Sequence, residues 1–365
     1  MNVCIIGDGL TSLSLAKNLV NKKINVHIYQ KDKIKNSPTN RTIGLAKNNL
    51  DYVEKEILSL PKKNIWQIKK IKIFSEKIDN DPMLNFEKNN NVLFCMVKND
   101  EFYQLLKKNL SKNKFFKKKT IKGINFFKNL INEKKYDLII NCDQNNFFAK
   151  KFFSNVIDKD YCNVAYTTIL KHKKLNNRTA IQIFTKFGPI AFLPTSNTET
   201  AVVFSLDVKD HKYNDQEVID LIKKYNPQFK IEKILRLNNF KLKSSNLRSY
   251  HYKNILAFGD SLHRIHPLAG QGFNMIIRDI KILSNIIQEK IDIGVQLDQI
   301  VLEEFEKKTR HKNFIFSNGI DFIYELFNFD KKNTDKNLSK IIKCFGSSKR
   351  LNNTLVTLAD RGLGI

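Results

Sequence analysis

Two glycines near the start of the chain have the spacing of turns that bind phosphate groups. The segment matches G-x-G-x-x-G except that Ser12 holds the place of the third glycine. Such a turn needs bare backbone at Gly9, where a pyrophosphate approaches, and free N–H groups with a positive dipole at the start of the next helix. The pattern predicts a dinucleotide site, with an ordinary strand-to-helix turn as the alternative. Its candidate residues are Gly7, Gly9, Leu10, Thr11 and Ser12.

The elements around this turn form a β-α-β unit. Apolar residues of 10–20 recur at helical spacing between strands predicted at 2–6 and 24–29. Because short crossover connections are right-handed, these strands are expected to be parallel neighbours. A dinucleotide-binding second strand should end on an acidic residue that accepts from the adenosine ribose. Gln30 holds that position, and its amide can bond a hydroxyl only without charge assistance.

A second run, residues 259–274, is the most specific signal in the chain. It follows a short apolar strand predicted at 255–258, which would deliver Asp260 to its carboxyl end. A carboxylate there can accept a hydrogen bond from a ligand hydroxyl. The backbone N–H groups of 270–272 would lie at the start of a helix predicted at 273–290, a position that suits an electron-rich or anionic group.

This second run resembles the flavin-dependent aromatic hydroxylases of the para-hydroxybenzoate hydroxylase type, and within them the ubiquinone-biosynthesis hydroxylases that act on prenylated phenols. The resemblance implies that the aspartate binds the ribityl chain of FAD and that the proline and the glycine-rich loop lie along the isoalloxazine. It implies cofactor contacts for Asp260, Pro267, Gly270, Gln271, Gly272, Phe273 and Asn274. The candidate catalytic residues among them are Pro267, Gly270, Gln271 and Gly272.

Shorter matches extend the resemblance over nearly the whole chain. Arg41 is similar to the arginine that reaches the flavin cofactor after the second strand, and 184–194 resembles a pattern of the substrate-domain sheet. Asp143 matches an FAD-contacting turn of the family. Gln144 departs from it, because the family prefers a glycine there that can take a positive φ. Ser12, Gln30 and Gln144 are thus three departures from the family pattern at expected FAD contacts, and each weakens the contact expected there.

The resemblance implies an FAD-dependent monooxygenase that hydroxylates a prenylated phenol or related aromatic in ubiquinone biosynthesis, through a flavin C4a-hydroperoxide. The partners implied are O2, the phenol, and NAD(P)H or a partner-supplied electron source. The first alternative is a halogenase or prenyl-chain reductase of the same fold, and the single Trp argues against a halogenase. The second is a weakly flavin-binding or non-catalytic accessory protein of a quinone-synthesis assembly. We expect both motifs to converge on one FAD.

The spacing of His263 and His266 could suggest a metal pair, but they precede a proline in a loop without a matching set of Cys or acidic residues. We therefore predict no metal site and a packing or site-lining role for both histidines.

The charge and the composition of the chain limit the classes of partner that it is expected to bind. Lys and Arg number 63 against 36 Asp and Glu, but only nine of the cations are Arg. Nucleic-acid readers favour the Arg fork, so nucleic acid is not expected and a nucleic-acid binder is the third alternative, whereas a Lys-rich exterior could hold the protein against an anionic membrane surface. Five dispersed Cys and no secretory signal indicate a cytoplasmic protein, in the peripheral case at the inner face of the membrane.

The predicted class is α/β, with a Rossmann-like FAD-binding domain interleaved with an antiparallel-sheet substrate domain and a helical C-terminus. Strand-like runs at 161–170, 179–187, 191–194 and 201–208 predict the antiparallel sheet. The predicted FAD-binding domain comprises 1–70, 92–160 and 245–320. The substrate domain comprises 71–91 and 161–244, and the C-terminal helical segment 321–365.

Overall fold

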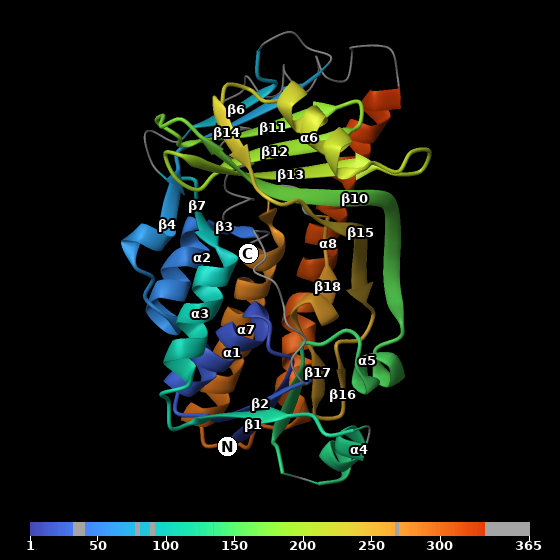
Figure 1. Cartoon of the computed structure of the whole chain (residues 1–365). Helices are drawn as coiled ribbons and strands as arrows, with labels where there is room; N and C mark the ends of the chain where they lie inside the picture. Colours follow the sequence, from blue (N-terminus) through green and yellow to red (C-terminus); the bar gives the residue numbers. More distant parts are fainter. Residues whose placement is uncertain are drawn as a thin grey trace.

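The computed structural model describes residues 1–31, 41–76, 81–87, 92–123, 125–133, 135–266 and 270–332. It has two stacked lobes (Figure 1), the lower built on a six-stranded sheet and the upper on a nine-stranded sheet. A three-stranded sheet lies at one side between them. Its order is β3-β7-β4, with antiparallel pairing throughout. The strands are β3 (Thr42–Ala46), β4 (Ile65–Ile68) and β7 (Phe94–Lys98).

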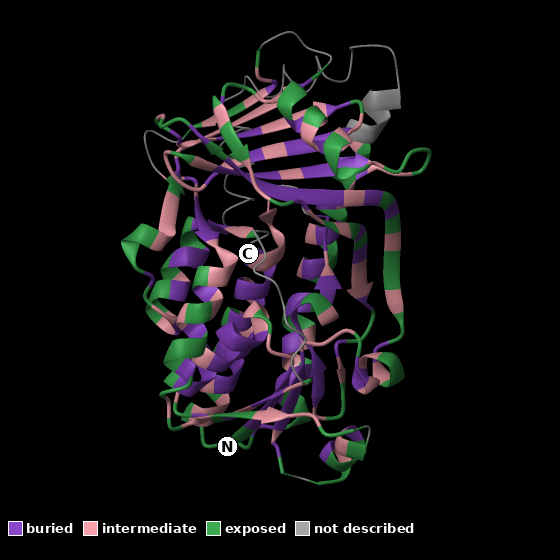
Figure 2. Cartoon of the chain, in the orientation of Figure 1, coloured by how far each residue is buried: buried purple, intermediate pink, exposed green. Residues whose placement is uncertain are grey.

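The lower sheet has the order β16-β17-β9-β1-β2-β8, and all its pairs except β16 with β17 are parallel. Its strands are β1 (Asn2–Ile6), β2 (Asn25–Gln30), β8 (Phe116–Thr120), β9 (Leu138–Asn141), β16 (His251–Tyr252) and β17 (Ile255–Ala257). Strands β9 and β17 are buried along their whole length (Figure 2), because parallel strands with covered faces carry apolar runs. The predicted parallel β-α-β unit is confirmed.

Helices cover this sheet and fill the space below the upper lobe. Helices α1, α3 and α7 pack together, and α8 packs on α7 and runs upward to the nine-stranded sheet (Figure 1). The helices of the lobe are α1 (Leu10–Asn21), α2 (Lys47–Tyr52), α3 (Asn99–Leu110), α4 (Asn125–Asn132), α5 (Phe147–Phe152), α7 (Gly272–Asp292) and α8 (Gln299–Lys332). The helix predicted at 50–60 is instead α2 followed by a π-helical turn at Val53–Ile57.

The upper sheet has the order β18-β15-β10-β13-β12-β11-β5-β6, with β14 paired to β10. The four predicted strands correspond to β10 to β13, and their antiparallel pairing is confirmed. Strand β5 adds a parallel pair with β11. The strands are β5 (Lys70–Ser75), β6 (Leu84–Glu87), β10 (Val156–His172), β11 (Thr179–Thr185), β12 (Gly188–Pro194), β13 (Glu199–Asp207), β14 (Ile231–Ile234), β15 (Asn238–Leu247) and β18 (His263–Arg264).

The two faces of the upper sheet have different neighbours. Helix α6 (Asp215–Lys224), begun by a capping box of Asn214 and Glu217, covers one face with an apolar core. The opposite face meets α8, where Tyr161 and Leu242 of the sheet cluster with Tyr324 of the helix. This second face is turned toward the lower lobe.

Strand β10 crosses between the lobes. It is 17 residues long, and it bends out of the upper sheet toward the lower lobe (Figure 1). Its pairing with β15 continues through the bend, with a shift of register between Asp160 and Asn163 and a positive φ of 54° at Cys162.

The α/β class with interleaved lobes and a helical C-terminal part is confirmed. The predicted domain limits at 160/161 and 320/321 fall inside β10 and α8, and the predicted division stays a prediction. Among the described residues, none of the helices combines the length and the apolar character needed to cross a bilayer.

Candidate cofactor-binding and active site

The two predicted motifs lie in contact at the carboxyl edge of the lower sheet. The glycine turn follows β1 and the aspartate-led loop follows β17, with the end of β9 between them. A Cβ placed on Gly259 would be 2.5 Å from Cγ2 of Thr11, at the start of α1. A Cβ on Gly7 would be 3.1 Å from Oγ of Ser12 and 3.5 Å from Cβ of Cys142. The first motif therefore touches both neighbouring turns.

The start of α1 leaves space and donors for a ligand. Gly9 is the N-cap and no side chain caps the helix, so its first N–H groups lack the usual side-chain acceptor. A Cβ on Gly9 would meet nothing within 4 Å, which marks open space in front of the helix. Gly7 has a φ of 115°, which a side chain would strain. Leu10 lies half-buried against the core of the lobe.

Gln144 joins three turns of the site. Its amide Nε2 donates to the backbone carbonyl of Asp260, and its Oε1 accepts from the guanidinium of Arg264. Its backbone does not take a positive φ, unlike the family position that it matches. The Asp260 side chain is left exposed at the edge of the turn. The side chain that departs from the family pattern thus clamps the aspartate-led loop.

Lys31 and Asp143 form an ion pair across the glycine turn. Lys31 follows β2 and its Nζ lies 3.1 Å from Oδ2 of Asp143, which follows β9, so the ion pair spans the two neighbours of β1. Gln30 ends β2 and is half-buried. Lys31 was not predicted from the sequence, although its place directly after a parallel strand could have indicated it.

The loop before α7 carries further open backbone. Gly270 has a φ of 64°, and a Cβ there would lie 3.9 Å from the backbone N of Gly44 in β3. A Cβ on Gly272 would meet nothing within 4 Å. Gln271 is the N-cap of α7, yet its side chain makes no capping bond and its buried Oε1 has no partner among the described residues. Pro267 lies outside the described residues.

Asn274 and Phe273 are engaged by the protein. Asn274 accepts from the backbone N of Ala46 at 2.9 Å and donates to the backbone O of Gly44 at 2.8 Å. The Phe273 ring meets Phe102 edge-on, with centroids 6.3 Å apart. In this structure both side chains hold the start of α7 against its neighbours.

Arg41 contacts the upper sheet. It is exposed, and its guanidinium lies 4.7 Å from the ring centroid of Phe240 on β15. Its expected contact with the cofactor stays a prediction.

The histidines of the loop have separate surroundings. His263 Nε2 lies 2.5 Å from Oδ2 of buried Asp279 on α7, and Asn313 of α8 donates to the same carboxylate. This pair fixes the loop to both helices. His266 is buried between Tyr161 and Tyr324. Over the ranges that the structure describes, no three His, Cys, Asp or Glu side chains gather as metal ligands would.

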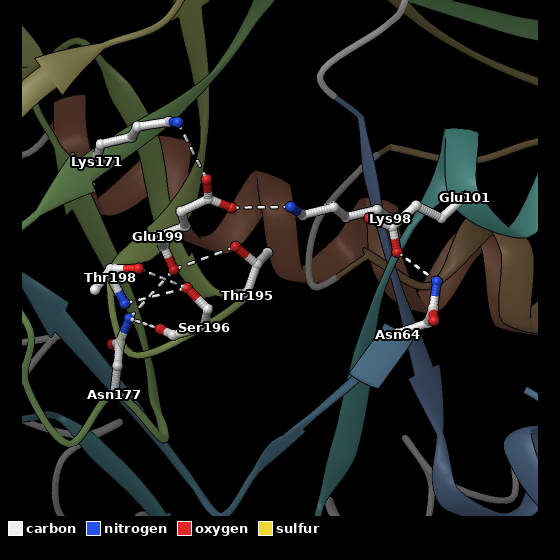
Figure 3. Close-up of polar contacts among 9 residues, drawn as sticks. All are labelled: Asn64, Lys98, Glu101, Lys171, Asn177, Thr195, Ser196, Thr198 and Glu199. Carbon is white, nitrogen blue, oxygen red and sulfur yellow. Dashed lines mark hydrogen bonds and ion pairs between the residues drawn. The ribbon is translucent and has the colours of Figure 1, made fainter. Parts of the chain in front are cut away.

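Polar contacts also join the lobes at the three-stranded sheet (Figure 3). Lys98 of β7 donates to Glu199 of β13 at 2.9 Å, and Lys171 of β10 lies 3.7 Å from the same carboxylate. Burial opposes ionisation of Glu199, but the hydrogen bond and charge of Lys98 lower its pKa overall. Asn177 holds the adjacent hairpin by donating to the backbone O of Ser196 at 2.8 Å.

The residues at the junction fit a bound flavin nucleotide. Of ten buried side-chain N and O atoms without a partner in the described part of the chain, five belong to the segment 261–278: Ser261 Oγ, both ring nitrogens of His266, Gln271 Oε1 and Arg278 Nη2. Buried polar atoms without partners are costly, so their concentration beside two open glycines suits bound groups, a flavin nucleotide and its substrate, that hydrogen-bond them.

Comparisons with known proteins show the fold and a family match over part of the chain. Residues 155–293 match a family described as "FAD binding domain". The fold is that of FAD-dependent aromatic monooxygenases. The p-nitrophenol 4-monooxygenase PnpA of Pseudomonas putida DLL-E4 superposes with a TM-score of 0.77 over 97% of this chain and 96% of that one, at 11% identity. PqsL of Pseudomonas aeruginosa, described as a probable FAD-dependent monooxygenase, gives 0.71 over 94% and 99%, at 13% identity.

Sequence relatives are more particular. The chain is 25% identical over 186 residues to the ubiquinone biosynthesis monooxygenase COQ6 of Dictyostelium discoideum, covering 41% of this chain and 38% of that one. It is 29% identical over 152 residues to the 3-demethoxyubiquinol 3-hydroxylase of Escherichia coli K12, covering 40% and 39%. The matches thus span about two fifths of these relatives. The resemblance to the ubiquinone-biosynthesis hydroxylases is confirmed.

Proposed function

We propose that the protein is an FAD-dependent monooxygenase that hydroxylates a prenylated phenol or a related aromatic in ubiquinone biosynthesis, with NAD(P)H as electron donor. The observation that carries the proposal is the contact between the glycine turn and the aspartate-led loop, at Thr11 and Gly259. That contact supports the proposal because it brings the two motifs side by side, where one extended nucleotide could bind both. The relatives named for ubiquinone biosynthesis support the substrate class.

When bound, FAD supplies the oxygen-transfer chemistry and the protein supplies position and electrostatics. The start of α1 at Gly9 would hold the pyrophosphate, because no side chain caps its first N–H groups and a Cβ on Gly9 would meet nothing within 4 Å. Asp260 would accept from the ribityl hydroxyls, with Gln144 fixing its backbone. Gln271 and Gly272, at the start of α7, would place N–H groups and a positive dipole beside the electron-rich edge of the flavin ring.

The first experiment asks whether the purified protein binds FAD, by visible absorbance. Gly9→Val puts a side chain into the open space at Gly9, where a Cβ meets nothing within 4 Å, and the extended backbone there suits any residue. We expect it to remain folded and lose FAD. Gly319→Val, at an exposed position of α8 with nothing within 4 Å, is the matched control and should keep FAD. Equal FAD binding by both variants would refute the assigned pyrophosphate position.

The second experiment tests the reaction. Anaerobic titration of the FAD-loaded protein with NADPH and NADH, with candidate phenols present, should bleach the flavin, and oxygen should then yield a hydroxylated phenol. Bleaching without product would remove the hydroxylase proposal.

An accessory role is the second candidate, and the Lys31–Asp143 ion pair favours it. The ion pair engages Asp143, an expected FAD contact, and β2 ends on Gln30 without a carboxylate. A colourless protein whose absorbance does not change on adding FAD would support this candidate.

The substrate would reach the enzyme at an anionic membrane surface. The net charge of +27 would draw the protein to such a surface. Helix α8 exposes the apolar side chains of Phe314, Ile315 and Phe322, which could contact the lipid. Sedimentation with liposomes that contain anionic lipid should occur at low salt and weaken as salt rises. Absence of sedimentation at low salt would contradict this assignment. We also propose that the protein binds partner proteins of a quinone-synthesis assembly.

A further inference from the structure

His266 is the most deeply buried unpaired titratable side chain of the aspartate-led loop. It is 1% exposed, and neither Nδ1 nor Nε2 has a hydrogen-bond partner in the described part of the chain. A neutral imidazole carries one donor and one acceptor. Among the described residues neither the donor nor the acceptor is satisfied, which is a cost that native structures retain where another group completes the site.

The neighbours of His266 cannot satisfy it, because they present rings. Tyr161 meets the imidazole edge-on with centroids 4.9 Å apart, and Tyr324 lies at 4.4 Å with 30° between the planes. The Tyr161 hydroxyl donates to Asp321 of α8, and the Tyr324 hydroxyl shares a hydrogen bond with Asn163 at 2.8 Å. Both hydroxyls are thus engaged elsewhere.

The imidazole is uncharged at neutral pH. Burial, and secondarily the positive charge of Lys159, lower the pKa of His266 to about 4. Lys159 itself pairs with Glu325 of α8, and the Asp321 carboxylate faces Tyr161 and Ser244. An uncharged imidazole walled by aromatic rings suits a neutral hydroxyl, which can donate to its bare nitrogen. A carboxylate would find only one weak donor there.

The position of His266 matches that chemistry. The loop that carries it begins at Asp260 and ends at Gly272, the two points proposed to hold the flavin. Its ring contacts Tyr161, on the face of the upper sheet opposite α6. His266 therefore joins the proposed cofactor loop to the sheet of the predicted substrate domain.

We propose that His266 hydrogen-bonds the ring hydroxyl of the phenolic substrate, with the Tyr161 and Tyr324 rings holding the imidazole in place. The inference rests on the proposed function and adds to it the group that recognises the hydroxyl. It assigns the enzyme a preference for a free phenol over the corresponding ether.

The test compares two probes that differ in this hydroxyl alone: a short-chain 2-prenylphenol and its O-methyl ether. Dissociation constants are measured by equilibrium titration with the FAD-loaded protein, without reductant, so that turnover does not contribute. The wild type should bind the phenol about tenfold more tightly than the ether, the usual effect of one buried hydrogen bond. His266→Phe should abolish this ratio, and His266→Gln should restore part of it.

His27→Phe is the matched control, because His27 also meets a tyrosine edge-on but lies on β2. It should keep the wild-type ratio. A wild-type protein that binds both probes equally, or a His266→Phe variant that keeps the preference, overturns the inference and leaves the proposed function standing. Failure of the FAD-loaded wild type to bind either probe or to hydroxylate the phenol overturns both.

Discussion

The contact between Gly259 and Thr11 can be tested by adding one methyl group. Gly259 has a φ of 64°, so alanine there pays about 1–2 kcal/mol for a left-handed backbone. Its Cβ would also lie 2.5 Å from Thr11 Cγ2 and 3.3 Å and 3.4 Å from Thr11 Oγ1 and Cβ, so the threonine must shift from its preferred position to make room. Overpacking of this kind adds about 1–3 kcal/mol. We expect Gly259→Ala to lower the free energy of unfolding by about 2–5 kcal/mol.

A double-mutant cycle separates the two contributions. Thr11→Ser removes Cγ2, so the pair Thr11→Ser with Gly259→Ala should recover about 1–2 kcal/mol relative to Gly259→Ala alone. Gly123→Ala is the backbone control, because Gly123 has a φ of 70° and a Cβ there meets nothing within 4 Å. It should cost about 1–2 kcal/mol and show no coupling to Thr11→Ser.

Urea unfolding of the wild type, the three single variants and the two double variants with Thr11→Ser, followed by far-ultraviolet circular dichroism, gives these free energies. FAD affinity should fall in Gly259→Ala and recover in the double variant. The close approach of the two motifs is refuted if Gly259→Ala costs no more than Gly123→Ala, or if Thr11→Ser restores nothing.

Three further predictions concern charge. Burial, and secondarily the charge of nearby lysines, lowers the pKa of both His27 and His266 to about 4. Between pH 6.5 and 4 the unfolded chain therefore binds more protons than the folded protein. The free energy of unfolding consequently falls on acidification. From pH 7 to 5 this loss should be about 2 kcal/mol for His266 and about half of that for the more exposed His27, and urea unfolding of His266→Gln should show the smaller pH dependence. Asp279→Asn should cost about 3 kcal/mol by breaking the buried pair with His263, and a loss below about 1 kcal/mol would contradict that pairing. Glu199→Gln should cost about 1 kcal/mol at low salt and less at high salt, as thermal unfolding at two ionic strengths would show.

The parts of the fold that follow from local pattern were predictable. The β-α-β unit is encoded by an apolar strand, a glycine turn and a helical repeat within 30 residues, so its parallel pairing follows from the crossover rule. The antiparallel strands β10 to β13 likewise follow from alternating runs and polar turns. In contrast, β5 pairs with β11 in parallel across a separation that no local pattern encodes.

The position of the site was predictable from the sequence, but several of its contacts were not. Spacing indicated the glycine turn and the aspartate-led loop, because backbone requirements of a nucleotide appear directly as glycines. The clamp by Gln144 and the ion pair of Lys31 depend on which strands become neighbours, and only the strand order β17-β9-β1-β2 shows it. The walls around His266 come from β10 and α8, more than 100 residues apart in the chain.

The bent strand β10 also limits how the two lobes can move. Its ladder with β15 runs on through the bend at Asp160 and Asn163, so the lobes are connected by a two-stranded ribbon. Rigid rotation about a flexible linker is incompatible with that ladder. Relative motion of the lobes would instead twist the ribbon. The displacement of the upper sheet would be small at β18, beside the ribbon, and largest at β6, at the opposite edge of the sheet.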